Sequence, residues 1–227
     1  MVNVTPVTVL IPAFNEEPRI GAVLEVICNI ERPHRIVVID DGSKDGTSKV
    51  ASQYPVDVLR HPHNRGKGAA LQTGIDYIKG SPLWLFLDAD LINLRPDHVE
   101  ELLQPLEADE SLGMTVGVFQ GGKLNVDLAQ QYFGILNGQR GFRGVFIENV
   151  PSLHWCRFGV EIFLSKLADH YRVPVSYPAL KGITHHTKEE KFGFANGLYQ
   201  RLKMYYECLY ALLNWRKHCI ADLYLPW

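Results

Sequence analysis

"RIVVIDDGSKDGT" (35–47) joins a buried strand, a turn and the start of a helix. Its β-branched apolar run stops at two adjacent aspartates, Asp40 and Asp41. The pairs Gly42-Ser43 and Gly46-Thr47 follow them. Such an uninterrupted run is typical of a strand covered on both faces of a parallel sheet. A strand-end turn needs one Asx residue and a glycine, whereas a second carboxylate beside the first repels it. The stretch therefore predicts a strand–turn–helix unit whose turn has a role beyond turning.

The same rhythm runs through the first half of the chain. Further strands are expected at 7–12, 56–61, 83–88 and 113–120, and helices begin near Pro18, near Asp45 or Thr47, at Gly66 and at Pro96. Alternating strands and helices predict an α/β fold with a mostly parallel, doubly wound sheet and helices on both faces. Leucine and tyrosine at helical spacing in 194–216 predict a C-terminal helical extension.

Composition narrows the class of protein. The chain has 227 residues, 46% of them hydrophobic, and a formal net charge of −2. This composition predicts one domain with an appendage and gives no basic footprint for nucleic acid. Four cysteines without C-x-x-C spacing indicate free thiols in a reducing compartment, and hence a cytoplasmic protein. The N-terminal apolar stretch is too short for a signal peptide or a membrane span.

Polar clusters follow the predicted strands. Asn15-Glu16, Asp40-Asp41 and Asp88-Ala89-Asp90 come after the first, second and fourth strands, and the basic "HPHNRGKG" (61–68) follows the third. Ligands of open α/β sheets bind outside the carboxyl ends of the strands, so these clusters predict a site there. Strand alternation would point both carboxylates of "DAD" to one side, and carboxylate oxygens suit Mg²⁺ or Mn²⁺. A turn-capping pair is the other reading. Neither a P-loop nor a G-x-G-x-x-G fingerprint is present.

Four segments, "VTVLIPAFNEE", "VVIDDGSKDGT", "HNRGKGAALQTG" and "LFLDADL", resemble glycosyltransferase family 2 in their order and spacing. The resemblance is strong over 5–125 and looser over 126–216. It implies a GT-A fold and metal-dependent transfer of a sugar from a UDP- or GDP-linked donor. It also implies a nucleotide-sugar-binding half at 1–125, an acceptor-binding and metal-completing half at 126–193, and a C-terminal helix and tail at 194–227. The residues that the resemblance places around the donor are Pro12, Ala13, Glu16, Asp40 or Asp41, Lys67, and the metal-flanking Asp88-Ala89-Asp90.

The second half is expected to supply the acceptor site. In "LNGQRGFRGVF" (136–146), Arg140 and Arg143 lie three apart, and two guanidiniums can clamp a phosphate. The segment is similar to the "GQR" segment of family members that glycosylate phosphorylated acceptors, including polyprenyl-phosphate sugar synthases. The alternative is that each arginine forms a structural ion pair with the sheet, which explains its presence equally well. The resemblance places Glu161 towards the acceptor, although a carboxylate also suits a helix N-terminus.

A late histidine is expected to complete the metal site. "HHTKEEKFG" (185–193) is similar to the C-terminal motif of one bacterial subgroup, which selects His185 as the ligand and leaves His186 as the alternative. Imidazole beside two carboxylates favours Mn²⁺ over Mg²⁺. Lys188 and Lys191 are candidates to neutralise the diphosphate, and the other histidines are expected at the surface or in turns.

The partners follow from these assignments. The donor is a nucleotide sugar, and the acceptor is a lipid phosphate such as polyprenyl phosphate or a small molecule such as phosphoglycerate, with inversion or retention left open. The C-terminal helix packs on its own domain or on a second copy in a homodimer; the alternative is a membrane-surface helix, which makes the protein peripheral. The rival functions are a nucleotidyltransferase and a non-catalytic nucleotide-sugar-binding protein.

Overall fold

The computed structural model describes residues 5–32, 34–121, 137–186 and 194–220. Within them, seven strands form the central sheet in the order β3-β2-β1-β4-β8-β6-β9. All neighbours in this sheet pair in parallel except β8, which is antiparallel to both β4 and β6. The expected mostly parallel α/β sheet is therefore confirmed. The strands are β1 (Val7–Ala13), β2 (His34–Asp40), β3 (Asp57–Arg60), β4 (Leu83–Phe86), β6 (Met114–Val116), β8 (Arg140–Arg143) and β9 (Val175–Ser176).

The strand order reverses at β1. The chain runs outward from β1 through β2 to β3, then returns to place β4 on the other side of β1. A crevice opens at such a switch point, because the connections leave in opposite directions. The loops that follow β1, β2 and β4 meet there, and we call this margin the strand-end rim.

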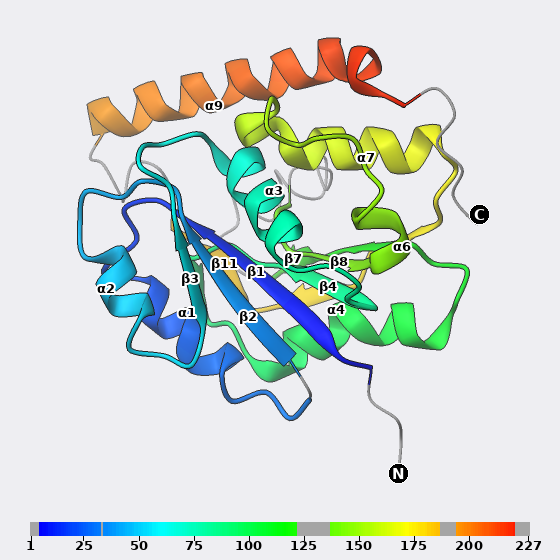
Figure 1. The fold of residues 1–227 in the computed structure, drawn as a ribbon, viewed down its shortest axis with the longest axis horizontal. Helices are drawn as coiled ribbons and strands as arrows, with labels where there is room; N and C mark the ends of the chain where they lie inside the picture. The colour runs from blue at the N-terminus through cyan, green and yellow to red at the C-terminus, as the bar shows by residue number, and fades with distance from the viewer. Residues whose placement is uncertain (1–4, 33, 122–136, 187–193, 221–227) are drawn as a thin grey trace.

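Helices cover both faces of the sheet, as doubly wound folds require (Figure 1). α1 (Ile20–Ile27) and α4 (Pro96–Ala108) pack with Val9 in one buried cluster, whereas α3 (Lys67–Tyr77) and α7 (Val160–His170) pack with Leu10 in a second. Successive strand residues thus enter opposite cores, which explains why the strands are apolar throughout. Each fully buried Leu, Ile or Val contributes about 1.5–3 kcal/mol.

The strand expected at 113–120 is divided in the structure. Segment 113–120 forms β6 and then β7 (Val118–Gln120), which leaves the central sheet and pairs with β10 (Ala179–Lys181). Gly117 lies at the break, where a Cβ would collide with the side chain of Leu180. β10 in turn is separated from β9, and a second small sheet joins β5 (Leu91–Ile92) to β11 (Thr184–His185).

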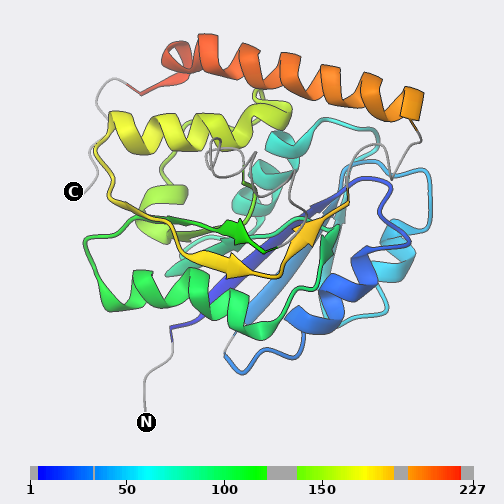
Figure 2. The same cartoon turned by 180° about the vertical axis from the view of Figure 1, so that it is seen from behind.

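The last long helix, α9 (Phe194–Asn214), lies outermost. It packs on α7 and on the short 3₁₀ helix η2 (Arg157–Gly159) rather than on the sheet, and both ribbon views show it crossing the outside of the molecule (Figures 1 and 2). None of the helices in the described ranges is long and apolar enough to cross a bilayer. The remaining short helices are α2 (Thr47–Ala51), α6 (Gly144–Ile147) and the 3₁₀ helix η3 (Trp215–His218).

Candidate functional site

The loops after β1 and β2 are fastened to each other. The backbone N–H of Asn15 donates to Ser43 Oγ (2.9 Å), and that of Glu16 donates to Thr47 Oγ1 (2.8 Å). In return, the N–H of Lys44 donates to Asn15 Oδ1 (2.8 Å). Asn15 has a φ of 56°, a left-handed conformation that asparagine tolerates better than most residues. These bonds hold the polar loops as one wall of the strand-end rim.

The residues expected around the nucleotide lie in this wall. Pro12 and Ala13 end β1, and Ala13 is in register with Asp40 and accepts the N–H of Asp41 (2.8 Å). The Glu16 carboxylate forms an ion pair with Arg19 (2.9 Å). The structure therefore brings these residues together, while their contact with a nucleotide stays a prediction.

Asp40 braces the turn in which it lies. Its side chain is fully buried and accepts the N–H of Ser43 (2.7 Å) and the hydroxyl of Ser48. The guanidinium of Arg60 lies 3.7 Å from the same carboxylate. Charged acceptors form stronger hydrogen bonds than neutral ones, so Asp40 is part of the reason the turn keeps its shape.

Asp41, by contrast, holds the loop that follows β3. Its carboxylate accepts the backbone N–H groups of Arg65 (2.9 Å) and Gly66 (2.7 Å), and His61 Nδ1 lies 2.7 Å away. His61 is 5% exposed and lies in the loop directly after β3, so it is not at the surface, whereas the alternative expectation of a place in a turn agrees with the structure. Because Gly66 has a φ of 97° immediately before α3, Asp41 fixes where that helix begins.

Lys67, the first residue of α3, lies between two carboxylates. Its Nζ is 2.5 Å from Asp88 Oδ1 and 2.6 Å from Glu161 Oε1, which unites predicted residues from the β4 loop and α7. A cation is disfavoured at a helix N-terminus. Burial alone would lower the pKa of Lys67, but the charges and hydrogen bonds of the two carboxylates outweigh it and raise the pKa above its ordinary value. Lys67 is therefore a cation at neutral pH.

Gln139 is a member of this cluster that the sequence reasoning missed. Its Nε2 donates to Asp88 Oδ2 (3.1 Å), and its Oε1 accepts the N–H of Asp88 (3.2 Å). A Cβ on the neighbouring Gly138 would lie 2.6 Å from Lys67 Nζ and 2.7 Å from Asp88 Oδ2, so a larger residue there would displace the ends of these two side chains. The sequence signal for it is the glutamine of "NGQR" (137–140), which directly precedes the arginine that was selected.

The residues expected to hold a metal ion lie along neighbouring strands. β4 ends at Phe86, so Asp88 and Asp90 belong to a turn and not to an extended strand, and the alternation argument does not apply. β11 pairs with β5 so that His185 is opposite Leu91, the residue after Asp90. Carboxylate and imidazole are donors suited to Mn²⁺, so the set fits in donor type.

Side chains are not gathered around a metal position. Asp88 bonds Lys67 and Gln139, and within the described part of the chain no three Asp, Glu, His or Cys side chains gather closely enough to hold an ion. His186 directly follows His185, the last residue of β11, and Lys188 and Lys191 lie outside the described residues. Metal ligation by Asp88, Asp90 and His185 thus stays a prediction.

The two arginines do not form the expected clamp. Arg140 is fully buried and donates to the Asn137 carbonyl (2.8 Å) and to Ser165 Oγ (3.0 Å). Arg143 donates to carbonyls at the end of α4, including that of Leu112 nearby (2.9 Å). Residues three apart on a strand face opposite sides, which is why β8 separates them. Burial lowers the pKa of Arg140 to about 10.

Arg157 connects the site to α9. With a φ of 46°, it forms an ion pair with Glu207 (2.9 Å) and donates to Asn64 Oδ1 (3.2 Å) and the Arg65 carbonyl (3.5 Å). A left-handed non-glycine residue is sparsely populated and often lies at a constrained position. Sequence patterns carry no signal for this bridge, because its partners are far apart in the chain.

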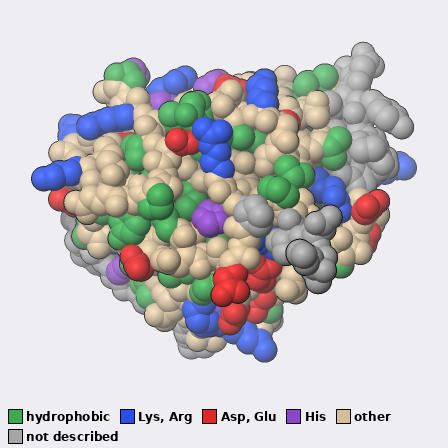
Figure 3. Space-filling view, turned by 60° about the horizontal axis from the view of Figure 1, so that its bottom comes forward, with side chains coloured by type: hydrophobic (Ala, Val, Ile, Leu, Met, Phe, Trp, Pro, Cys, Tyr) green, Lys and Arg blue, Asp and Glu red, His purple; other side chains and the backbone are tan. Residues whose placement is uncertain are grey.

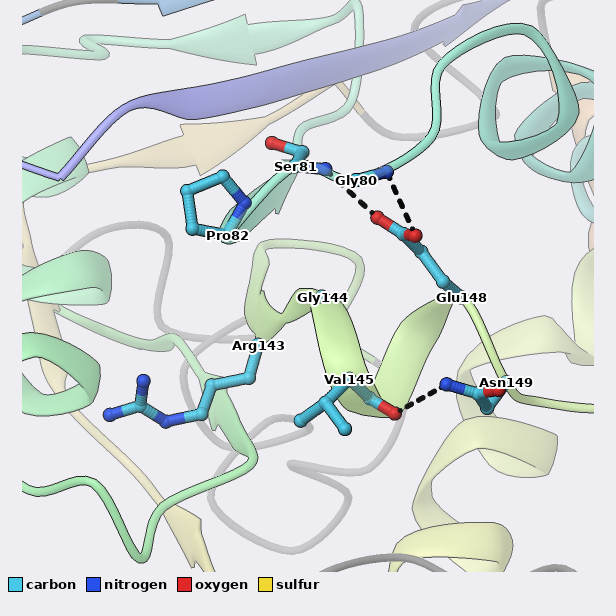
Figure 4. Close-up of a pocket in the computed structure, with 8 residues that line it drawn as sticks. All are labelled: Gly80, Ser81, Pro82, Arg143, Gly144, Val145, Glu148 and Asn149. Atoms are coloured by element: carbon cyan, nitrogen blue, oxygen red, sulfur yellow. Dashed lines mark hydrogen bonds between the residues drawn. The ribbon is translucent and has the colours of Figure 1, made fainter.

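A hollow of about 320 Å³ lies elsewhere, between the start of β4 and α6 (Figure 4). There the Glu148 carboxylate accepts the N–H groups of Gly80 (3.0 Å) and Ser81 (3.0 Å), and Arg143 points away from it. Since this hollow is at the amino end of β4, opposite the strand-end rim, its carboxylate fixes a loop and is no part of the candidate site.

The sequence matches a known family and several curated proteins. The family described as Glycosyl transferase family 2 matches residues 8–161. Dolichyl-phosphate beta-glucosyltransferase from Homo sapiens is 28% identical over 211 residues, which cover 74% of this chain and 64% of the human protein. The 4,4'-diaponeurosporenoate glycosyltransferase of Staphylococcus aureus is 35% identical over 117 residues, which cover 49% of this chain and 31% of that protein. The chain thus spans less than two thirds of either curated relative.

A solved structure is similar over nearly the whole chain. Glucosyl-3-phosphoglycerate synthase from Mycobacterium tuberculosis, in complex with Mn²⁺, uridine diphosphate and glucosyl-3-phosphoglycerate, superposes with a TM-score of 0.75 and 22% identity. The match covers 97% of this chain and 83% of the mycobacterial one. At this identity the likeness concerns the fold, and it confirms the expected GT-A architecture.

Proposed function

The chain belongs to glycosyl transferase family 2, and we propose that it moves a sugar from a UDP- or GDP-linked donor to a phosphorylated acceptor. The observation that carries the proposal is the Lys67 cluster, in which an ammonium lies within 2.6 Å of carboxylates from two separate elements of the strand-end rim. Transfer of a sugar leaves a nucleoside diphosphate, so negative charge develops on its phosphate oxygens. A cation held in place beforehand stabilises that charge without having to reorganise.

Different residues of the strand-end rim are assigned to different parts of the donor. We assign the wall of Pro12, Ala13 and Glu16 to the nucleoside, and Lys67 to the diphosphate. Asp41 contributes indirectly, because its bonds to Arg65 and Gly66 fix the loop that presents Lys67. An arriving diphosphate oxygen would replace one carboxylate at the ammonium.

Glu161 then has an acceptor-facing role. It lies in the first turn of α7, buried at the rim beside Lys67. An acceptor phosphate is already an anion and needs no general base, so we assign Glu161 to positioning rather than to proton abstraction. Arg140 and Arg143 have protein partners for their guanidiniums, so they are left out of the acceptor site.

A divalent cation fits this scheme through Asp88, Asp90 and His185. When bound, Mn²⁺ or Mg²⁺ would supply further positive charge at the diphosphate. The solved mycobacterial structures were obtained with Mn²⁺ and with Mg²⁺, each together with uridine diphosphate. This support comes from relatives, and the ligands named here are our assignment.

Two acceptors are favoured by different observations. Polyprenyl phosphate is favoured by the human relative, whose name specifies dolichyl phosphate and whose match covers 74% of this chain. Phosphoglycerate is favoured by the solved structure that covers 97% of it. We place polyprenyl phosphate first, because the helix nearest the rim has an apolar outer face, described below.

The test is a transfer assay with radiolabelled UDP-glucose and GDP-mannose, offered undecaprenyl phosphate in detergent or 3-phosphoglycerate, with and without Mn²⁺. Organic extraction separates the lipid product from the water-soluble one. Asp90→Asn should lower metal-dependent transfer at least about hundredfold, as loss of a key charged group does. The matched control is Asp97→Asn, an exposed aspartate in the first turn of α4, which should retain full activity.

Each rival function has its own outcome. Transfer of a nucleoside monophosphate to the acceptor would identify a nucleotidyltransferase. Donor binding seen by calorimetry, with neither transfer nor slow donor hydrolysis, would identify a binding protein. Unchanged metal-dependent transfer by Asp90→Asn would refute the assigned metal site.

A further inference from the structure

α9 presents its apolar side to solvent. Five leucines and four tyrosines between residues 198 and 213 are exposed, from 40% for Leu212 to 71% for Leu213. An ordinary surface helix turns such residues inward and its charges outward. A contiguous apolar face of this kind marks a surface that binds something, since single exposed leucines are common but a whole stripe is not. We call it the α9 outer face.

The inward side of α9 is small and polar instead. Between residues 197 and 214, the buried residues are Gly197, Glu207 and Ala211. Ala211 approaches Gly159 so closely that a Cβ on Gly159 would collide with it. Glu207 forms the ion pair with Arg157 and accepts the N–H of Phe158 (3.3 Å). The helix is therefore docked by polar contacts and close backbone approach, so its leucines are available to another partner.

The charges along α9 and η3 have one sign. Arg201, Lys203, Arg216 and Lys217 are basic, and the only acidic residue between 197 and 220 is Glu207, which is turned inward. Elsewhere the surface is mixed: seen from below, acidic and basic side chains lie together on the same face (Figure 3). The α9 outer face thus combines an apolar stripe with cations and lacks exposed carboxylates.

We propose that the α9 outer face docks on the surface of an anionic lipid bilayer. Interfacial helices combine an apolar face with Lys and Arg, and tyrosines favour the boundary between headgroups and acyl chains. A second copy of the chain suits the face less well. A two-fold interface must be self-complementary, and this one would bring cations against cations.

Docking would also place the candidate site near the bilayer. Arg157 joins Glu207 of α9 to Asn64 and Arg65 in the loop before Lys67. The amino-terminal half of α9 accordingly lies over the carboxyl ends of β1 and β2 (Figure 1). The inference itself stands on the exposed face and its charge and does not depend on which acceptor is used.

The experiment is co-sedimentation of the full chain with vesicles of phosphatidylcholine alone and with vesicles containing equal phosphatidylcholine and phosphatidylglycerol. We expect binding to the anionic vesicles, weakened by high salt, and little binding to the neutral ones. Leu209→Asp combined with Leu213→Asp should lower the partition coefficient at least about tenfold, because two buried leucines are lost. Val145→Asp is the matched control, a 43% exposed apolar residue on α6, and should bind as the wild type does.

A charge variant keeps the test decisive if the aspartates disturb folding. Lys203→Gln with Lys217→Gln should lower the partition coefficient about 25-fold, which corresponds to about 1 kcal/mol for each basic residue near the surface. Failure to bind anionic vesicles, or equal binding to neutral ones, would overturn the proposal. A stable dimer in light scattering that Leu213→Asp converts to monomer, without vesicle binding, would assign the face to a second copy instead.

Discussion

Replacement of Lys67 by methionine should destabilise the protein strongly. Methionine keeps most of the side-chain length but removes the charge, so the carboxylates of Asp88 and Glu161 lose the ammonium that lies between them. The side chains of Lys67, Glu161 and Asp88 are 14%, 10% and 26% exposed. Removal of one partner from a buried ion pair costs about 3–5 kcal/mol, and the partial exposure of Asp88 favours the lower end. For a chain of this size, about 3 kcal/mol lowers the melting temperature by about 6–12 °C.

Urea denaturation followed by circular dichroism measures this free energy of unfolding. Lys79→Met is the matched control, because Lys79 is exposed just beyond the same helix and should change stability little. Glu161→Gln completes a double-mutant cycle, in which the two substitutions should couple by more than about 1 kcal/mol. A loss below about 1 kcal/mol for Lys67→Met, or strictly additive effects, would show that the cluster behaves as a solvated surface pair and would refute the reasoning.

Three further predictions concern the same rim. Gly138→Ala places a Cβ 2.6 Å from Lys67 Nζ and should lower the free energy of unfolding, measured by urea denaturation, by about 1–3 kcal/mol. Gly21→Ala is the control, because its Cβ would have its nearest contact at 3.4 Å and should change stability little. An unchanged denaturation midpoint for Gly138→Ala would contradict the packing described. Asp41→Asn weakens three hydrogen bonds, to His61, Arg65 and Gly66, and should lower the free energy of unfolding by about 2 kcal/mol. The variant should also bind UDP-glucose more weakly in calorimetry. Wild-type values for both stability and binding would show that other contacts hold the loop. The pKa of Lys67 is raised above its unfolded value of 10.5, so its stabilising contribution is fully present below pH 10.5 and is lost as the pH rises through the folded-state pKa. The difference in unfolding free energy between wild type and Lys67→Met should therefore stay constant from pH 7 to 10. Convergence of the two free energies near pH 8 would argue against a buried cation.

The sequence predicted the fold well where local pattern and tertiary environment agree. The apolar runs of β1 and β2 predict strands covered on both faces, and residues of both strands do lie in each of the two buried clusters. The division of 113–120 was missed because it depends on Leu180, which is distant in the chain and packs against Gly117. Pattern reasoning sees neighbours in sequence, whereas this break is decided by a neighbour in space.

The candidate site was predicted in part for the same reason. Asp88, Glu161 and Lys67 were each selected, but their meeting at one ammonium depends on how α7 packs against α3. Arg140 and Arg143 were read as a pair from their spacing, although a strand sends such residues to opposite sides. Gln139 was not selected and the bond of His61 to Asp41 was not foreseen, since a buried polar residue differs from an exposed one only through partners that the sequence does not reveal.

Arg157 connects the outermost helix to the loop that precedes Lys67. Its guanidinium holds Glu207 on one side and the Asn64–Arg65 loop on the other, and that loop leads directly into Lys67. Movement of α9 away from the body would therefore break these contacts and remove one support of the loop before α3. One guanidinium thus links the exposed helix to the backbone that positions the ammonium of the candidate site.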